Sequence, residues 1–311
     1  MKDTPFCKFI FSIHPFFGDC NLQRKNICAT LGKYFREGGT SVLYWLIWLL
    51  AASAALAVQL TKDLWWLSLL TLLGGYLALL ILYVLFLFVL SRFVDMDKPA
   101  PKHWRTYRRV AEVSLKLLLS VLRVRVHVTG LDKLPKDERF LFTCNHRAIF
   151  DPMVGMVYLK GYDVSFVSKK ENFRIFIGGR LMHASGILSI DRENDRSAVR
   201  TIVQAIKYLK EDDRSIAIYP EGYTRKDKTV RLQPFRDGSL KIAQKANVPV
   251  AVSTVVGTDK IVRNFFHLRH TDVYFDILAL ISPADYAGEN THALGDAIWH
   301  MMDENLQKRD R

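Results

Sequence analysis

A histidine and an aspartate separated by four residues, His146 and Asp151, form the pair best suited to proton transfer in this 311-residue chain. They follow an apolar run that ends at Cys144, and an aspartate followed by Pro152 is a typical helix start. We therefore expect His146 in a tight loop, with Asp151 as the N-cap of the next helix. Such a turn can bring the carboxylate to the imidazole, fix its tautomer, and let the imidazole take a proton from an alcohol.

Two other interpretations of these residues remain open at this point. A loop histidine before an aspartate N-cap also occurs in proteins without a catalytic role for either residue. Alternatively, Cys144 acts as a covalent nucleophile, because on a continuing strand it would share a face with His146. A buried strand cysteine is the commoner explanation of such a residue.

A second set of candidates can bind an anion. The strand expected over residues 216–219 runs into Pro220, Glu221, Gly222, Tyr223, Thr224 and Arg225. The backbone at Gly222 can approach an anion closely, and Arg225 can hold phosphate oxygens in a bidentate fork. Lys169 and Arg192 lie near the ends of other expected strands and are further phosphate candidates. The alternative is that these cations form an ordinary solvated basic surface.

The elements that must position these residues begin at about residue 121, where short β-branched runs alternate with amphipathic stretches. We expect helices at residues 195–210, behind a capping Asn194 or Asp195, and at residues 238–246 and 293–306. Strands are expected at residues 124–128, 139–144, 164–168, 187–190, 215–219, 248–256 and 273–280. This α/β order predicts a mostly parallel sheet with the active residues near strand ends.

Two uncharged apolar runs, residues 41–60 and 64–91, precede this domain. Each can cross the hydrocarbon core of a bilayer, which is about 30 Å thick. Only three residues separate them, so we expect a transmembrane helical hairpin. Lys and Arg flank both outer ends, and the positive-inside rule places those ends in the cytosol. The sequence therefore predicts an integral membrane protein with its catalytic domain on the cytosolic face.

The expected organisation has four parts. Residues 95–109, rich in Pro, Lys and Arg, are expected to link the hairpin to the domain. The boundaries are 1–40 for a cytosolic N-terminal segment without an assigned role, 41–93 for the hairpin, 94–120 for a basic linker and helix, and 121–311 for the α/β domain.

Composition and the remaining motifs argue against several classes of protein. The formal net charge of +13 suits an anionic membrane surface or nucleic acid, but the chain has no nucleic-acid recognition motif. A signal peptide cleaved near residues 51–57 is disfavoured, because a second apolar run follows directly. Two buried helices of a soluble protein are disfavoured by the length of the uncharged runs. Cys7, His14, Cys20 and Cys28 match no familiar zinc spacing, and we expect no metal.

Taken together, four segments in order resemble the 1-acyl-glycerol-3-phosphate acyltransferase family over about residues 120–260. They are Asn145 and His146 with Asp151; Lys169 and Glu171 through Gly186 to Asp191 and Arg192; Pro220, Glu221 and Gly222 with Thr224 and Arg225; and Val248, Pro249 and Val250, which follow Pro234 and Phe235.

The resemblance implies that His146 and Asp151 form a catalytic dyad that transfers an acyl chain to the sn-2 hydroxyl of 1-acyl-glycerol-3-phosphate. Acyl-CoA or an acyl carrier protein would donate the chain, membrane lipids would be the partners, and no further cofactor would be needed. It also implies a hydrophobic tunnel for the acyl chain. The substrate-binding residues would be Asn145, Lys169, Arg192, Glu221, Gly222, Thr224 and Arg225.

Two positions depart from the family pattern. Tyr223 interrupts the usual Glu-Gly-Thr-Arg order, and Val252 stands where a second proline is common. Both departures affect the identity of the acceptor, so glycerol-3-phosphate or another lysophospholipid remains an alternative. A non-catalytic membrane protein that binds anionic lipid is a third possibility, against which His146, Asp151 and Glu221 count together.

Overall fold

The computed structural model describes residues 50, 53, 65–100, 104–191, 194–211, 213–224 and 230–310. It divides into two compact units, Met1–Ile81 and Leu82–Arg311. Most of the first expected apolar run and the cysteines Cys7, Cys20 and Cys28 lie outside the described residues.

One long apolar helix, α4 (Trp65–Arg92), precedes the sheet, as the second apolar run predicts. A 20-residue stretch of it is long and apolar enough to cross a membrane. Its last turns belong to the second unit and pack there. The Tyr83 and Ser114 hydroxyls are 2.8 Å apart, and the Phe88 and Phe176 rings stack with centroids 5.5 Å apart. The apolar helix therefore leads directly into the packed domain.

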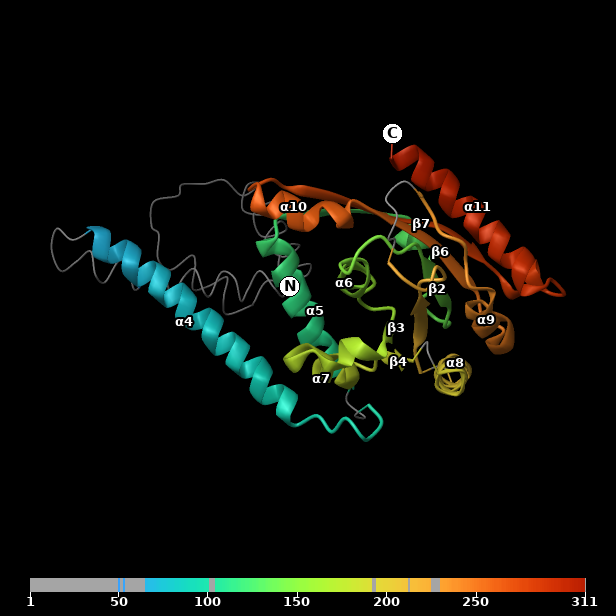
Figure 1. Cartoon of the computed structure of the whole chain (residues 1–311), viewed down its shortest axis with the longest axis horizontal. Coiled ribbons are helices and arrows are strands. Elements are labelled where there is room, and N and C mark those ends of the chain that lie inside the picture. The colour runs from blue at the N-terminus through green and yellow to red at the C-terminus, as the bar shows by residue number, and fades with distance from the viewer. Residues whose placement is uncertain are drawn as a thin grey trace, which may run out of the picture. The chain divides into compact units, whose positions relative to one another are not determined.

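The domain is built on a seven-stranded sheet in the order β1-β7-β6-β2-β5-β3-β4 (Figure 1). The strands from β6 to β4 are parallel to one another, whereas β7 is antiparallel to β6 and pairs in parallel with β1. The bounds are β1 Val124–Thr129, β2 Leu141–Cys144, β3 Val164–Lys169, β4 Leu188–Ile190, β5 Ser215–Ile218, β6 Val250–Val256 and β7 Thr271–Ile281. A strand lies at each of the seven expected places, and the predicted mostly parallel α/β fold is confirmed.

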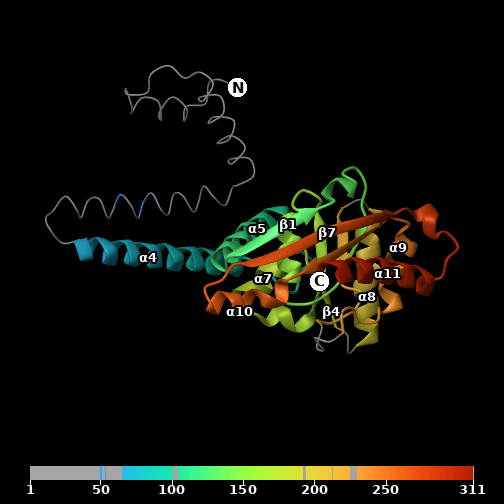
Figure 2. The same cartoon turned by 90° about the horizontal axis from the view of Figure 1, so that it is seen from above.

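Helices cover both faces of the sheet (Figures 1 and 2). On β2, Phe142 and Cys144 pack on the side of α5 and α6, whereas Leu141 packs on the side of α8, α9 and α11. This alternation follows from the two-residue period of a strand.

The α-helices of the domain are α5 Trp104–Val121, α6 Asp151–Tyr158, α7 Phe176–Ala184, α8 Asp195–Lys210, α9 Lys241–Ala246, α10 Ile261–Phe266 and α11 Thr291–Arg309. The short 3₁₀ helices are η1 Leu131–Lys133, η2 Lys170–Arg174, η3 Asp237–Ser239, η4 Thr258–Lys260 and η5 Pro283–Tyr286.

Two helix starts can be compared with the sequence. Asn194 caps α8, because its side-chain oxygen accepts the Ser197 N–H at 3.1 Å, as expected. Helix α5, in contrast, begins at Trp104 and takes up the end of the segment that composition suggests is a linker. Arg108 is buried there, 2.9 Å from the Glu112 carboxylate. Composition alone does not reveal that a basic residue is paired inside the fold.

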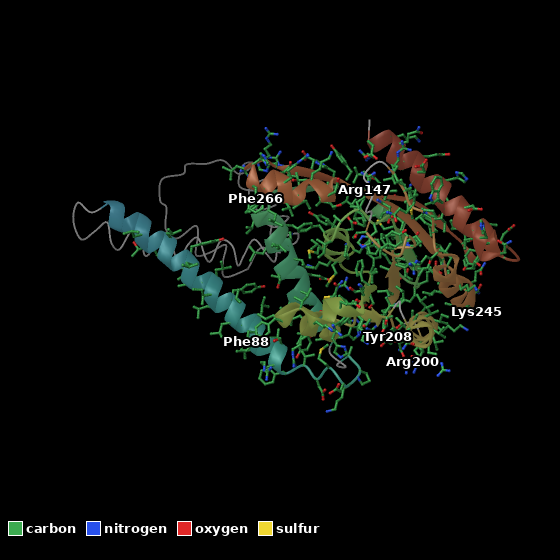
Figure 3. The ribbon with its side chains drawn as sticks, in the orientation of Figure 1. Phe88, Arg147, Arg200, Tyr208, Lys245 and Phe266 are labelled. Carbon is green, nitrogen blue, oxygen red and sulfur yellow. The ribbon has the colours of Figure 1, made fainter. Side chains whose placement is uncertain are left out.

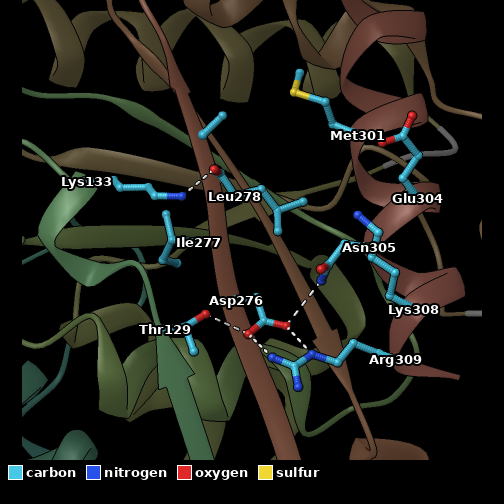
Figure 4. A pocket seen from close by; sticks show the side chains of 11 residues that line it. Thr129, Lys133, Asp276, Ile277, Leu278, Met301, Glu304, Asn305, Lys308 and Arg309 are labelled. Atoms are coloured by element: carbon cyan, nitrogen blue, oxygen red, sulfur yellow. Dashed lines mark hydrogen bonds and ion pairs between the residues drawn. The ribbon is translucent and has the colours of Figure 1, made fainter. Parts of the chain in front are cut away.

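Asp276, on β7, links the end of α11 to the sheet through hydrogen bonds (Figure 4). Its carboxylate accepts hydrogen bonds from the Thr129 hydroxyl at 2.7 Å, from Asn305 at 3.2 Å and from two Arg309 nitrogens at 2.8 Å. Burial opposes ionisation, but the hydrogen bonds from Arg309, Thr129 and Asn305 outweigh it and lower the pKa of the Asp276 carboxyl. The residue after Arg309 is thereby held in place, and it reaches the loop that carries His146.

Candidate active site

The carboxyl ends of three neighbouring parallel strands meet at one edge of the sheet. Strand β2 ends just before Asn145 and His146, and its neighbour β5 ends just before Tyr219 and Glu221. Lys169 is the last residue of β3 on the other side of β5. Segments separated by dozens of residues in the sequence thus supply one edge, as expected for a parallel sheet.

The Asp151 carboxylate is the centre of the loop that follows β2. It is buried, and one of its oxygens accepts hydrogen bonds from His146 Nδ1 at 2.9 Å, from the Arg147 N–H at 2.6 Å and from the Ala148 N–H at 2.7 Å. The other oxygen accepts from the Thr258 hydroxyl, which follows β6. An ionised carboxylate only accepts, so Nδ1 carries the proton and Nε2 is left as a proton acceptor.

The expectation that Asp151 is an N-cap is wrong. Asp151 is the first residue of α6, Phe150 stands at the cap position, and no side chain caps this helix. Pro152 is therefore the second helical residue. The carboxylate turns back into the preceding loop, because the imidazole and two backbone N–H groups of that loop all need an acceptor.

The His146 ring is fixed from the side by Tyr219. The two rings stack with centroids 4.4 Å apart and planes inclined by 28°. Burial raises the pKa of the Tyr219 phenol well above its ordinary value, so this ring stays neutral beside the imidazole. The His146 side chain remains 15% exposed, which leaves part of the imidazole open to solvent.

Glu221 has a role that its motif does not reveal. One oxygen of its buried carboxylate accepts the His146 N–H at 2.5 Å, and the other accepts the Gln233 N–H at 3.0 Å. Burial raises the pKa of the Glu221 carboxyl, although these two backbone hydrogen bonds oppose the rise. One oxygen therefore holds the histidine loop to the segment after β5, and the other holds the segment that contains Gln233.

Asn145 is likewise held within the fold. Its side-chain NH₂ donates to the Val255 carbonyl at 3.0 Å, and its oxygen accepts the Val255 N–H at 2.7 Å. The residue is 1% exposed. It ties the end of β2 to β6 and does not face the solvent from which an acceptor would arrive.

A cation that the sequence reasoning did not single out, Arg236, lies beside Gly222. A Cβ added to Gly222 would come 2.7 Å from Arg236 Nε, and the φ of 79° at Gly222 is a backbone conformation that favours glycine. Arg236 also lies over the Tyr223 ring, with its guanidinium carbon 5.9 Å from the ring centroid. The available signal was its position directly after Pro234 and Phe235, the residues noted ahead of the fourth motif.

Of the other expected binding residues, the structure describes Lys169 and Thr224. The Lys169 side chain is half exposed, and its Nζ is 3.3 Å from a Glu171 carboxylate oxygen. Thr224 is exposed on the segment after β5. Arg192 and Arg225 lie outside the described residues.

The loop is also braced by the end of the C-terminal helix. The buried Arg147 guanidinium forks onto the Asp310 carboxylate, with N to O distances of 2.9 and 2.6 Å. Arg147 is labelled in the upper half of Figure 3, and Asp310 directly follows α11. No local sequence pattern links residues so far apart in the chain.

Cys144 does not have the properties of a covalent nucleophile. Its side chain is 1% exposed and packs in the core on the α5 and α6 side of the sheet. Burial raises the pKa of the thiol well above its ordinary value, which keeps it protonated. The common explanation, a buried strand cysteine, fits these observations.

Several known proteins resemble this chain over the α/β domain. A family model described as acyltransferase matches residues 125–256. The chain is 28% identical to a 1-acyl-sn-glycerol-3-phosphate acyltransferase of Borreliella burgdorferi, over 59% of this chain and 74% of the relative. It is 32% identical to a chloroplastic enzyme of the same name from Brassica napus, over 48% of this chain but only 43% of the relative.

Among solved structures, the chain resembles the crystal structure of the 1-acyl-sn-glycerophosphate acyltransferase PlsC from Thermotoga maritima. The TM-score is 0.56 at 23% identity, and the alignment covers 74% of this chain and 89% of the other. Over this region the chain is therefore similar to 1-acyl-sn-glycerol-3-phosphate acyltransferases of the PlsC type.

Proposed function

We propose that this protein transfers a fatty-acyl group from a thioester to the sn-2 hydroxyl of 1-acyl-glycerol-3-phosphate, giving phosphatidic acid. The observation that carries the proposal is the His146 imidazole, which is held through Nδ1 by Asp151 at the carboxyl edge of a sheet shared with enzymes of that name. Acyl-CoA or an acyl carrier protein is the donor.

The proposed mechanism uses the dyad as a general base. His146 Nε2 takes the proton of the acceptor hydroxyl while the hydroxyl oxygen attacks the thioester carbonyl carbon. The tetrahedral intermediate collapses, the carbon–sulfur bond breaks, and the imidazolium returns the proton to the leaving thiolate. The Asp151 carboxylate stabilises the imidazolium between these steps. No covalent acyl-enzyme is formed.

We also propose that α4 is the second arm of a transmembrane hairpin whose outer ends, with the catalytic domain, face the cytosol. The length of α4 and the basic residues after it support this topology. Cysteines introduced among the first forty residues should react with an impermeant reagent from the cytosolic side only. Reaction from the opposite side alone would overturn the topology.

His146→Ala should lower kcat by about a hundredfold to ten-thousandfold, because the general base is lost. The matched control is Cys144→Ala on the preceding strand, which should keep most of the activity. Initial rates with labelled acyl-CoA and 1-acyl-glycerol-3-phosphate measure kcat. Circular dichroism shows whether both variants fold. Turnover near the wild-type rate in folded His146→Ala would refute the dyad.

Glu221→Gln should lower kcat much more than it raises the Michaelis constant for the acceptor. The amide presents an NH₂ group where a carboxylate oxygen now accepts the His146 or Gln233 N–H, so the loop shifts. Steady-state kinetics with varied acceptor separate the two effects. If the Michaelis constant alone rises, Glu221 contacts the acceptor and our assignment of its role is wrong.

We propose that the acceptor phosphate is bound by Lys169 and Arg236, with Arg192 and Arg225 from the segments outside the described residues. A charge-assisted hydrogen bond is worth about 1.5 to 3 kcal/mol, so each alanine variant should raise the Michaelis constant about tenfold to a hundredfold. The constant for a phosphate-free monoacylglycerol should change little.

The control for this test is Lys245→Ala, an exposed cation on α9 at the far side of the domain (Figure 3). It should leave both constants unchanged. If all four variants raise the Michaelis constant equally for both acceptors, these cations do not bind the phosphate. That result would favour a different lysolipid acceptor.

A further inference from the structure

Helix α10 and the loop after it expose large apolar side chains that no element of the described domain covers. The exposed fractions are 51% for Val262, 77% for Phe266 and 75% for Leu268. Val262 and Phe266 are four residues apart and therefore share one face of the helix. Figure 3 shows Phe266 at the outer end of α10. Clustered exposure of this kind marks an interaction surface.

The backbone holds Leu268 outward in an unfavourable conformation. Its φ is 55°, in the left-handed region that residues with a side chain rarely adopt. The Leu268 N–H donates to the Phe265 carbonyl at 2.9 Å, and its carbonyl accepts from Arg123 at 2.6 Å. The next N–H, of Arg269, donates to Asn264 at 2.8 Å. A strained conformation fixed by several bonds, with an apolar side chain outside, indicates a function for that side chain.

Cations surround these apolar side chains. Lys260, Arg263 and Arg269 are all exposed within the same stretch of the chain. Large apolar side chains bordered by Lys and Arg are typical of segments that lie in the membrane interface, where the cations meet anionic lipid headgroups. The charge therefore selects an anionic bilayer surface as the partner.

The position of this surface fits the same partner. Arg123, which donates to the Leu268 carbonyl, lies two residues after the end of α5, where Leu118 and Val121 are also exposed. In Figures 1 and 2, the outer end of α10 lies near the end of α5. Exposed apolar side chains of α5 and of the α10 region therefore lie near one another on the domain.

We propose that residues 260–270, the α10 tip, form a second membrane contact, in which Phe266 and Leu268 insert among anionic lipid headgroups. The catalytic domain is then attached to the bilayer at α4 and at the α10 tip, and this fixes its orientation. The contact requires that α4 is embedded, but it does not depend on which acceptor the enzyme uses.

A depth measurement on the full chain tests the contact. Leu268→Cys, with Cys7, Cys20 and Cys28 changed to serine, carries an environment-sensitive fluorophore in lipid nanodiscs; buried Cys144 stays unlabelled. The matched control is Val203→Cys on α8, where the side chain is 58% exposed. We expect lipid-borne spin labels to quench the probe at position 268 and aqueous iodide to quench the probe at position 203. The lipid quenching should weaken when phosphatidylglycerol is replaced by phosphatidylcholine.

Equal iodide quenching at both positions would overturn the proposal, and so would a disulfide between two Leu268→Cys chains, which would identify a second copy as the partner. Quenching that is independent of anionic lipid would overturn the assignment of the cations. None of these readouts needs activity, so they are separate from tests of the proposed function.

A kinetic experiment addresses the consequence of the contact. The double variant Phe266→Asp and Leu268→Asp should transfer acyl groups to acceptor in nanodiscs about tenfold more slowly or worse, because two large apolar side chains no longer enter the interface. Its rate with detergent-dispersed acceptor should match wild type. Val199→Asp with Val203→Asp on α8 is the control. An unchanged rate in nanodiscs, or equal loss in both media, would contradict the contact.

Discussion

The requirement that the buried Asp151 carboxylate be satisfied shapes the whole candidate site. A carboxylate removed from water needs hydrogen-bond donors around it, or its burial is costly. Here the donors are the His146 imidazole, two N–H groups of the same loop and the Thr258 hydroxyl. The loop is therefore wrapped around the carboxylate, and the imidazole orientation follows from it. Thr258 can contribute only because β6 lies next to β2 in the sheet.

The neighbouring strands extend this arrangement. Glu221 after β5 accepts the His146 N–H, Asn145 after β2 is bonded to β6, and Arg147 is paired with Asp310 after α11. Each bond joins the histidine loop to a different part of the domain. A preorganised base of this kind loses little free energy to reorientation when the acceptor arrives. In the same arrangement the polar side chains of Asn145 and Glu221 are used for hydrogen bonds within the fold.

The sequence was informative where function depends on local pattern. Strand positions followed from β-branched runs, α8 and its cap from helical periodicity, and the pairing of His146 with Asp151 from their spacing. The sequence was uninformative about hydrogen-bond and ion-pair partners that other strands and helices contribute. Nothing near Glu221 indicates the His146 N–H, and nothing near Arg147 indicates Asp310, because those contacts depend on strand order and on how α11 docks. Arg236 was overlooked because its proximity to Gly222 arises from the path of the chain after β5. Asp151 was misplaced by one helical position for the same kind of reason, since its partners lie behind it.

A lipid acceptor suits an enzyme that is attached to the bilayer. In our proposal the phospholipid acceptor and its product reside in the bilayer, and α4, which leads into the domain, attaches the enzyme to it. The central claim is that Asp151 orients His146 and stabilises its protonated form, and kcat of Asp151→Asn tests it most directly. Because the amide keeps the size of the carboxylate but not its charge, our account predicts a fall of roughly a hundredfold or more in a variant that still folds. A folded Asp151→Asn enzyme with kcat within a few-fold of wild type would contradict it.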